Sequence, residues 1–148
     1  MHTVAIIQAR MGSTRLRGKS LMGICGEPLL LKVINQVKGS NLVSEVIVVT
    51  TNLEEDEPIV ELCKKINLRF FRGSKNNVLE RYFKAAEITK ADIIVRITGD
   101  CPLIAPDTID EVIEGFLKSN CSYVSNTNPY TRSEGQDVEV FDNETLKI

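Results

Sequence analysis

The chain has 148 residues with 43% hydrophobic and 26% charged side chains, a composition typical of one soluble globular domain over residues 1–148. Its 18 basic and 20 acidic residues give a net charge of −2, and aromatic residues make up only 5%, which argues against a nucleic-acid-binding surface. No apolar run approaches the roughly 18 residues that cross a bilayer, and the first residues lack the basic segment of a signal peptide. We therefore expect a cytoplasmic protein without nucleic-acid or membrane partners.

The sequence also argues against nucleophilic catalysis by a Ser-His-Asp or Cys-His arrangement. The only histidine, His2, precedes the first apolar run of the chain. The four cysteines are widely spaced and include no Cys-x-x-Cys pair. This spacing indicates reduced thiols rather than disulfides or a metal site.

In chain order, apolar runs typical of strands alternate with segments whose apolar residues recur at helical spacing. We predict strands over residues 4–7, 45–50, 68–71, 91–97, 122–125 and 138–141. We predict helices over residues 27–37, from near residue 58, over 78–88 and over 106–118. The run at 45–50 is apolar on both faces, which suits a parallel strand covered on both sides. The alternation predicts an α/β fold with three αβα layers and a mostly parallel sheet.

The loops that follow the predicted strands carry the polar candidates for a site. Right-handed crossovers place these loops on one edge of a parallel sheet, where open sheets bind ligands. The loops at this edge are residues 10–19, 51–56, 73–77 and 99–102.

The first of these loops, residues 10–19, is strongly basic. Residues 1–26 contain four cations and no Asp or Glu, whereas the remaining chain has 14 basic and 20 acidic residues. Glycines let backbone N–H groups point inward, and Arg and Lys add charge and hydrogen-bond donors, so the loop is typical of an anion site, here for a nucleoside triphosphate. Gly12 and Gly18 lie six residues apart, which matches neither the P-loop nor the dinucleotide fingerprint. A solvated turn is the alternative.

Four stretches of the chain together resemble one enzyme family. They are residues 9–16 with Gly18 and Lys19, residues 73–74 with 78–82, residues 96–104, and residues 137–141. This set resembles the cytidylyltransferases that make CMP-activated acidic sugars, and within them the branch of spore-coat polysaccharide biosynthesis protein F. The resemblance implies a nucleotide-diphospho-sugar transferase fold (GT-A or Rossmann-like). It also implies Mg²⁺-dependent transfer of CMP from CTP to an acidic sugar acceptor, with release of pyrophosphate, for surface polysaccharides such as those of the spore coat.

The resemblance also implies roles for individual residues. It gives catalytic roles to Arg10, Lys19 and Asp100, with Arg10 and Lys19 on the phosphates of CTP. The nucleotide-binding residues that it implies are Ala9, Gly12, Ser13, Arg15, Gly73, Ser74 and Asn77. The segment 73–77 would lie against the base and ribose, although a capped helix start explains the same residues. Arg17 departs from the family pattern, which usually has a proline before the Gly-Lys pair, so we expect a less pre-ordered loop.

Asp100 and Asp137 are the expected Mg²⁺ ligands, by the same resemblance. A hard divalent ion that bridges phosphates takes one or two carboxylates and otherwise water. A hydrogen-bonded turn aspartate is the alternative for Asp100, and a charged edge-strand residue is the alternative for Asp137. Alternation along the last strand sends Asp137, Glu139 and Phe141 to one face. Arg81 and Arg96 either pair with acids in the interior or reach the active edge.

Residues 142–148 at the end of the chain have the pattern of a helix start, with Leu146 and Ile148 as its first apolar contacts. Because members of the resembled family continue past this point, we expect a chain truncated at its C-terminal end. The alternative is a shortened protein that covers its exposed sheet edge by pairing with another chain. The resemblance to the family also implies that the protein forms a homodimer.

The acceptor side of the reaction is less defined by the sequence. Residues 126–134, with Tyr130 and Arg132, are the local candidates for contacting the sugar. Two other functions remain open: a glycosyltransferase that uses a finished nucleotide-sugar, and a nucleotide-binding remnant without activity.

Overall fold

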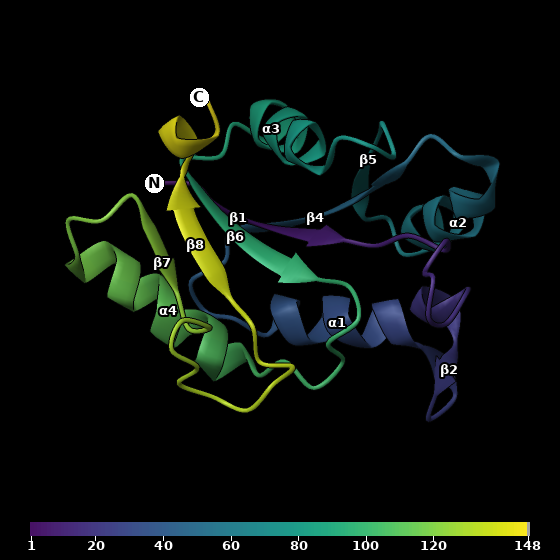
Figure 1. Ribbon diagram of the computed structural model, residues 1–148, viewed down its shortest axis with the longest axis horizontal. Coiled ribbons are helices and arrows are strands. Elements are labelled where there is room, and N and C mark those ends of the chain that lie inside the picture. The colour runs from purple at the N-terminus through teal and green to yellow at the C-terminus, as the bar shows by residue number, and fades with distance from the viewer. Residues whose placement is uncertain (148) are drawn as a thin grey trace.

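The computed structural model describes residues 1–147, which form a six-stranded sheet between helices (Figure 1). The sheet order is β5-β4-β1-β6-β8-β7. The parallel strands are β1 (Thr3–Gln8), β4 (Glu45–Thr51), β5 (Arg69–Gly73) and β6 (Ile93–Thr98). Two more strands, β7 (Tyr123–Ser125) and β8 (Glu139–Asp142), are antiparallel to each other, and β8 is antiparallel to β6. The predicted mostly parallel sheet is confirmed.

Helices cover both faces of this sheet, as the three-layer prediction requires. The α-helices are α1 (Leu29–Lys38), α2 (Glu57–Lys65), α3 (Val78–Thr89) and α4 (Pro106–Lys118). The short 3-10 helices are η1 (Lys19–Leu21), η2 (Glu54–Asp56) and η3 (Asn143–Leu146). The larger core joins the sheet to α1, α2 and α4, and the smaller core joins its other face to α3. Figure 1 shows α3 above the sheet, with α1 and α4 below it.

Alternating side chains explain why the strands are apolar on both faces. In β1, Val4 and Ile6 pack in the core under α3, whereas Ala5 and Ile7 pack in the larger core. The final strand obeys the same rule, because Val140 enters the larger core and Phe141 the smaller one. A central parallel strand must bury both faces, and this requirement fixes its register.

The region before α1 differs from the prediction. Glu27–Pro28 is not the first turn of a helix but a short strand, β3, that pairs with β2 (Gly23–Ile24). Pro28 is extended (φ −56°, ψ 139°), so the helix begins at the next residue. Gly39 ends α1 as expected, but its φ of −75° is not the left-handed conformation of a typical terminal glycine. A Cβ there would lie 2.9 Å from Pro106 Cγ, so close packing accounts for the glycine.

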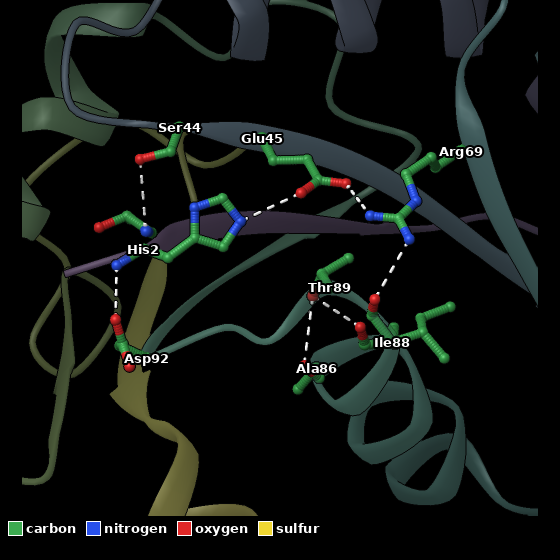
Figure 2. Close-up of polar contacts among 10 residues, drawn as sticks. His2, Ser44, Glu45, Arg69, Ala86, Ile88, Thr89 and Asp92 are labelled. Atoms are coloured by element: carbon green, nitrogen blue, oxygen red, sulfur yellow. Dashed lines mark hydrogen bonds and ion pairs between the residues drawn. The ribbon is translucent and has the colours of Figure 1, made fainter.

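The amino edge of the sheet is held by a polar network around the only histidine (Figure 2). The His2 amide donates to Asp92 Oδ2 at 2.6 Å, and His2 Nε2 lies 3.0 Å from Glu45 Oε2. Arg69 Nη1 donates to the other oxygen of Glu45 at 2.7 Å, and its Nη2 donates to the carbonyl of Ile88. His2, Glu45, Arg69 and Asp92 precede or begin β1, β4, β5 and β6. His2 is therefore a structural residue at the edge opposite the predicted site.

The last described residues pack on the face of the sheet that carries α3. The predicted helix start is the 3-10 helix η3, in which Asp142 Oδ1 accepts from the Thr145 amide at 2.8 Å. Leu146 is buried in the smaller core, as expected, while Ile148 lies outside the described residues. Within residues 1–147, no helix has both the length and the apolar character that a membrane crossing requires.

Candidate functional site

A cavity of about 250 Å³ opens at the carboxyl ends of β1 and β6. Its lining comes from two segments, the end of β1 with the basic loop and the end of β6 with the turn that follows. The lining residues are Gln8, Ala9, Arg10, Ser13, Thr14, Arg15, Lys19, Ser20, Arg96, Thr98, Gly99 and Asp100. The structure thus brings six of the predicted site residues into one cavity: Ala9, Arg10, Ser13, Arg15, Lys19 and Asp100.

The basic loop is closed on itself by hydrogen bonds to one carbonyl. The Met11 carbonyl accepts from the Ser13 amide at 3.0 Å and from the Gly18 amide at 2.8 Å. Ser20 Oγ donates to the Arg10 carbonyl at 3.1 Å, which fastens the end of the loop to its beginning. Gly18 has a φ of 74°, a conformation that glycine adopts without strain. Gly12 belongs to this loop but does not line the cavity.

An acidic segment, Glu54–Asp56, anchors the basic loop from outside. Asp56 is buried, and its Oδ1 accepts from the Met11 amide at 2.7 Å while its Oδ2 accepts from the Thr51 hydroxyl. Glu55 Oε2 accepts from Arg17 Nη2 at 2.8 Å. Arg17, which stands where the resembled family usually has proline, is thus held by an ion pair on the surface. Asp56 was not among the site residues predicted from the sequence, although its side chain holds the basic loop.

Asp100 and Lys19 form an ion pair at the mouth of the cavity. Lys19 Nζ lies 2.8 Å from Asp100 Oδ2, and both side chains are partly exposed. Burial alone would raise the pKa of Asp100, but the hydrogen bond and charge of Lys19 outweigh it and hold that pKa below its usual value. Asp100 is placed by Gly99, whose amide donates to the Gln8 carbonyl at 2.8 Å. A Cβ on Gly99 would lie 2.6 Å from the same carbonyl oxygen, so the close approach of β1 and β6 requires glycine.

Asp137 precedes β8 and does not line the cavity. Burial raises the pKa of the Cys101 thiol, and the charges of Asp100 and Asp137 raise it further. Asp137 Oδ1 is buried and has no hydrogen-bond partner among the described residues. Such an oxygen lacks the donor or cation that buried carboxylates require.

The two carboxylates are a donor set that fits Mg²⁺. Within residues 1–147 there is no group of three or more His, Cys, Asp and Glu arranged to hold a metal. Mg²⁺ commonly takes one or two carboxylates and completes its shell with substrate phosphates and water. The unpartnered Oδ1 of Asp137 agrees with that pattern. The metal role of Asp100 and Asp137 stays a prediction.

The segment 73–77 lies outside the cavity, and its residues have structural partners. Asn77 is the N-cap of α3, where its Oδ1 accepts from the Glu80 amide at 3.0 Å, so the alternative of a capped helix start is confirmed. Gly73 packs on Arg81, since a Cβ would lie 2.7 Å from Arg81 Cγ. The carbonyls of Ser74 and Lys75 both accept from Arg81 Nη1. A contact of this segment with the nucleotide stays a prediction.

The two arginines that the sequence left open have different surroundings. Arg81 is 1% exposed, and burial lowers its pKa. It has no acidic side chain within ion-pair distance among the described residues, and its Nε has no hydrogen-bond partner. Arg96 lines the cavity, pairs with Glu139 and lies over the ring of Tyr82 at 5.9 Å. Arg96 therefore both pairs with an acidic side chain and reaches the cavity at the carboxyl edge of the sheet.

Comparisons with known proteins identify the family of the chain. Residues 4–147 match the family described as Cytidylyltransferase. The spore coat polysaccharide biosynthesis protein SpsF of Bacillus subtilis is 36% identical over 80% of this chain and 51% of its own length. A 3-deoxy-manno-octulosonate cytidylyltransferase of Trichlorobacter lovleyi is 39% identical over 79% of this chain and 46% of its own.

A solved cytidylyltransferase from Leptospira borgpetersenii has the same architecture. It superimposes with a TM-score of 0.93 at 37% identity, over 99% of this chain and 63% of that one. The chain spans about half the length of the curated relatives it matches. The family match, the relatives and the shared fold all indicate the same family. The chain belongs to the cytidylyltransferase family.

Proposed function

We propose that the chain binds CTP in the 250 Å³ cavity and forms the nucleotide side of a site that transfers CMP to an acidic sugar. The observation that carries this proposal is the convergence of Arg10, Arg15 and Lys19 on one cavity whose mouth holds Asp100. Two relatives support the acceptor class and the pathway, because their names specify a sugar acid and a spore coat polysaccharide. The product would serve surface polysaccharide biosynthesis in the cytoplasm.

In this proposal the basic loop neutralises the triphosphate. An acceptor hydroxyl oxygen attacks the α-phosphorus, and the bond from that phosphorus to the bridging oxygen breaks. Pyrophosphate leaves with the bonding electrons, and the hydroxyl proton passes to solvent. Arg10, Arg15 and Lys19 stabilise the charge that develops on the leaving pyrophosphate, and the closed loop holds them in place beforehand.

Lys19 has a second role in the free protein. Its ion pair with Asp100 holds its ammonium at the cavity mouth, so the side chain is positioned before the nucleotide arrives. Mg²⁺ would be held by Asp100 and Asp137, and when bound it would supply charge neutralisation at the α-phosphate. Asp100 has a lowered pKa and is ionised at neutral pH, as a metal ligand must be.

The test compares two cations of the same loop. Lys19→Ala removes a cation that lines the cavity, so we expect the dissociation constant for CTP with Mg²⁺ to rise at least about tenfold in calorimetric titrations. Arg17→Ala is the matched control, because Arg17 is exposed, pairs with Glu55 and does not line the cavity. We expect its affinity to stay within about twofold of the wild type. Equal losses in the two variants would overturn the assignment.

A further inference from the structure

The loop between β7 and β8 runs beside the turn that follows β6, and one side chain fastens the two together (Figure 1). Gln136 Oε1 accepts from the Ala105 amide at 2.9 Å, and Gln136 Nε2 donates to the Leu103 carbonyl. One side-chain amide thus satisfies a donor and an acceptor of the same turn, which fixes its orientation. The next residue in the chain is Asp137, whose buried Oδ1 has no hydrogen-bond partner among the described residues.

The turn that receives Gln136 also carries Asp100, and it is anchored to the core. Within this turn, the Ile104 side chain is fully buried in the larger core. From the side of α1, Gln36 Nε2 donates to the Ile104 carbonyl at 3.0 Å. Gln136 therefore connects the backbone next to Asp137 with an anchored segment that contains Asp100.

A second side-chain amide holds the backbone on both sides of Asp137. Asn126 Nδ2 donates to the Gln136 carbonyl at 2.6 Å, and Asn126 Oδ1 accepts from the Val138 amide at 2.9 Å. The backbone amide of Asn126 donates to the Val138 carbonyl at 3.3 Å, as the β7–β8 register requires. The side-chain oxygen of Asn126 therefore takes the place of a backbone carbonyl in this ladder. Asp137 is held in place by its two neighbours rather than by contacts of its own carboxylate.

The exposed part of the same loop has different contacts. Tyr130 and Arg132, which were expected from the sequence to contact the sugar, do not line the nucleotide cavity. Tyr130 is 58% exposed, and Arg132 pairs with Glu111 of α4. A contact of either residue with an acceptor stays a prediction.

We propose that Gln136 is a positioning residue, which sets the place of the Asp137 carboxylate relative to Asp100 by joining the two segments that carry them. The proposal rests on the proposed function, in which both carboxylates hold Mg²⁺. This ion demands near-ideal octahedral geometry, so two carboxylates from separate segments serve it only when their spacing is fixed. The loss of Gln136 should therefore weaken the effect of Mg²⁺ on CTP binding and leave the contacts between the triphosphate and the basic loop intact.

The test measures the Mg²⁺-dependent gain, which is the ratio of the CTP dissociation constants without and with Mg²⁺ in calorimetric titrations. Gln136→Met keeps the length of the side chain and removes both of its hydrogen bonds to the turn. We expect the gain to fall at least about tenfold, while the CTP dissociation constant without Mg²⁺ stays within about twofold of the wild type. An unchanged gain, or an equal loss of affinity with and without Mg²⁺, would refute the proposal.

Gln36→Met is the matched control, because Gln36 anchors the same turn through one side-chain hydrogen bond to Ile104. Among the described residues, Gln36 makes no hydrogen bond to the loop that carries Asp137. We expect the gain of this variant to equal that of the wild type. An equal fall in Gln36→Met and Gln136→Met would mean that loosening the turn is sufficient, and the proposed link to Asp137 would be wrong.

A second variant covers the case in which Gln136→Met does not fold. Gln136→Glu has the same shape and keeps Oε1 as an acceptor, but it turns an oxygen toward the Leu103 carbonyl. Because an added negative charge attracts Mg²⁺, a fall in the gain can come only from displacement of the loop. We expect such a fall, and a rise or an unchanged gain would contradict the positioning role.

Asp137→Asn separates this inference from the proposed function. If Asp137→Asn lowers the gain, adding Gln136→Met should lower it no further, because Gln136 acts through Asp137. A further fall in the double variant, or a fall in Asp137→Asn without one in Gln136→Met, defeats the positioning role alone. If the wild type shows no gain, or Asp137→Asn leaves the gain unchanged, the proposed metal role fails and the positioning role fails with it.

Discussion

Asp56 supports the nucleotide cavity without lining it. Its carboxylate accepts from the Met11 amide, and the Met11 carbonyl in turn closes the basic loop through Ser13 and Gly18. Asp56→Ala should therefore lower the free energy of unfolding by about 2–3 kcal/mol, the loss expected when a buried carboxylate leaves its donors unpaired. Asp56→Asn keeps one acceptor oxygen and should lose less than half of that. Urea unfolding measures both, and a fully stable Asp56→Ala protein would contradict this role.

Gly99 is a second residue whose effect follows from geometry. A Cβ at this position would meet the backbone oxygen of Gln8 at 2.6 Å, and backbone cannot move aside cheaply. We expect Gly99→Ala to destabilise the fold by about 1–3 kcal/mol and to displace Asp100. Gly115 in α4 has no heavy atom within 4 Å of an added Cβ, so Gly115→Ala should stabilise by about 0.5–1 kcal/mol. Thermal unfolding of both variants checks the contrast in sign.

Part of the site could be predicted at the level of residues. Arg10, Arg15, Lys19 and Asp100 follow two apolar strands, and parallel strands bring their carboxyl ends together. Asp56 was missed because its role depends on a contact with Met11, 45 residues away. Arg96 was left undecided for the same reason, since its partner Glu139 lies 43 residues further along the chain. A pattern within a short stretch of sequence cannot predict contacts between residues so far apart in the chain.

At the level of elements, periodicity predicted the long segments well. The bounds of α4 match the prediction at both ends, because its apolar positions recur over three turns. The β2–β3 hairpin was missed because two-residue strands carry no alternation to detect. Asn77 combined a capping pattern with a family pattern; the hydrogen bond that its Oδ1 accepts from the Glu80 amide confirms the cap, and its contact with the nucleotide stays a prediction.

The amino edge of the sheet gives a prediction about pH. Burial alone would raise the pKa of Glu45, but hydrogen bonds from Arg69 and His2 outweigh it and lower that pKa below 4.5. At pH values near the folded pKa, the Glu45 carboxyl therefore binds fewer protons in the folded state than in the unfolded state. Its ionised form stabilises the fold fully above about pH 4.5. This contribution is lost as pH falls through the lowered folded pKa.

Glu45→Gln tests that sign. The variant should be less stable than the wild type at pH 6, because Arg69 loses its charged partner. At a pH below the folded pKa the two proteins should converge, since the wild-type carboxyl is then neutral as well. Urea unfolding at both pH values measures the difference. A gap that widens in acid would contradict the assignment.

At the scale of the whole molecule, the stabilising polar network and the candidate site lie at opposite edges of the sheet. The polar network around His2 ties the amino ends of the parallel strands (Figure 2). The basic loop and Asp100 lie at the carboxyl ends of β1 and β6. The chain spans about half the length of its curated relatives, so activity, metal use and homodimer formation are proposals about the protein as a whole.

The measurement that tests the central claim most directly is thermal unfolding with ATP, CTP, GTP and UTP, each with and without Mg²⁺. A ligand that binds only the folded state raises the midpoint in proportion to its affinity. CTP binding at the basic loop, with Mg²⁺ held by Asp100 and Asp137, predicts a rise with CTP that depends on Mg²⁺ and exceeds the rise with the other three nucleotides. No rise with any nucleotide, or an equal rise with all four, would contradict the account.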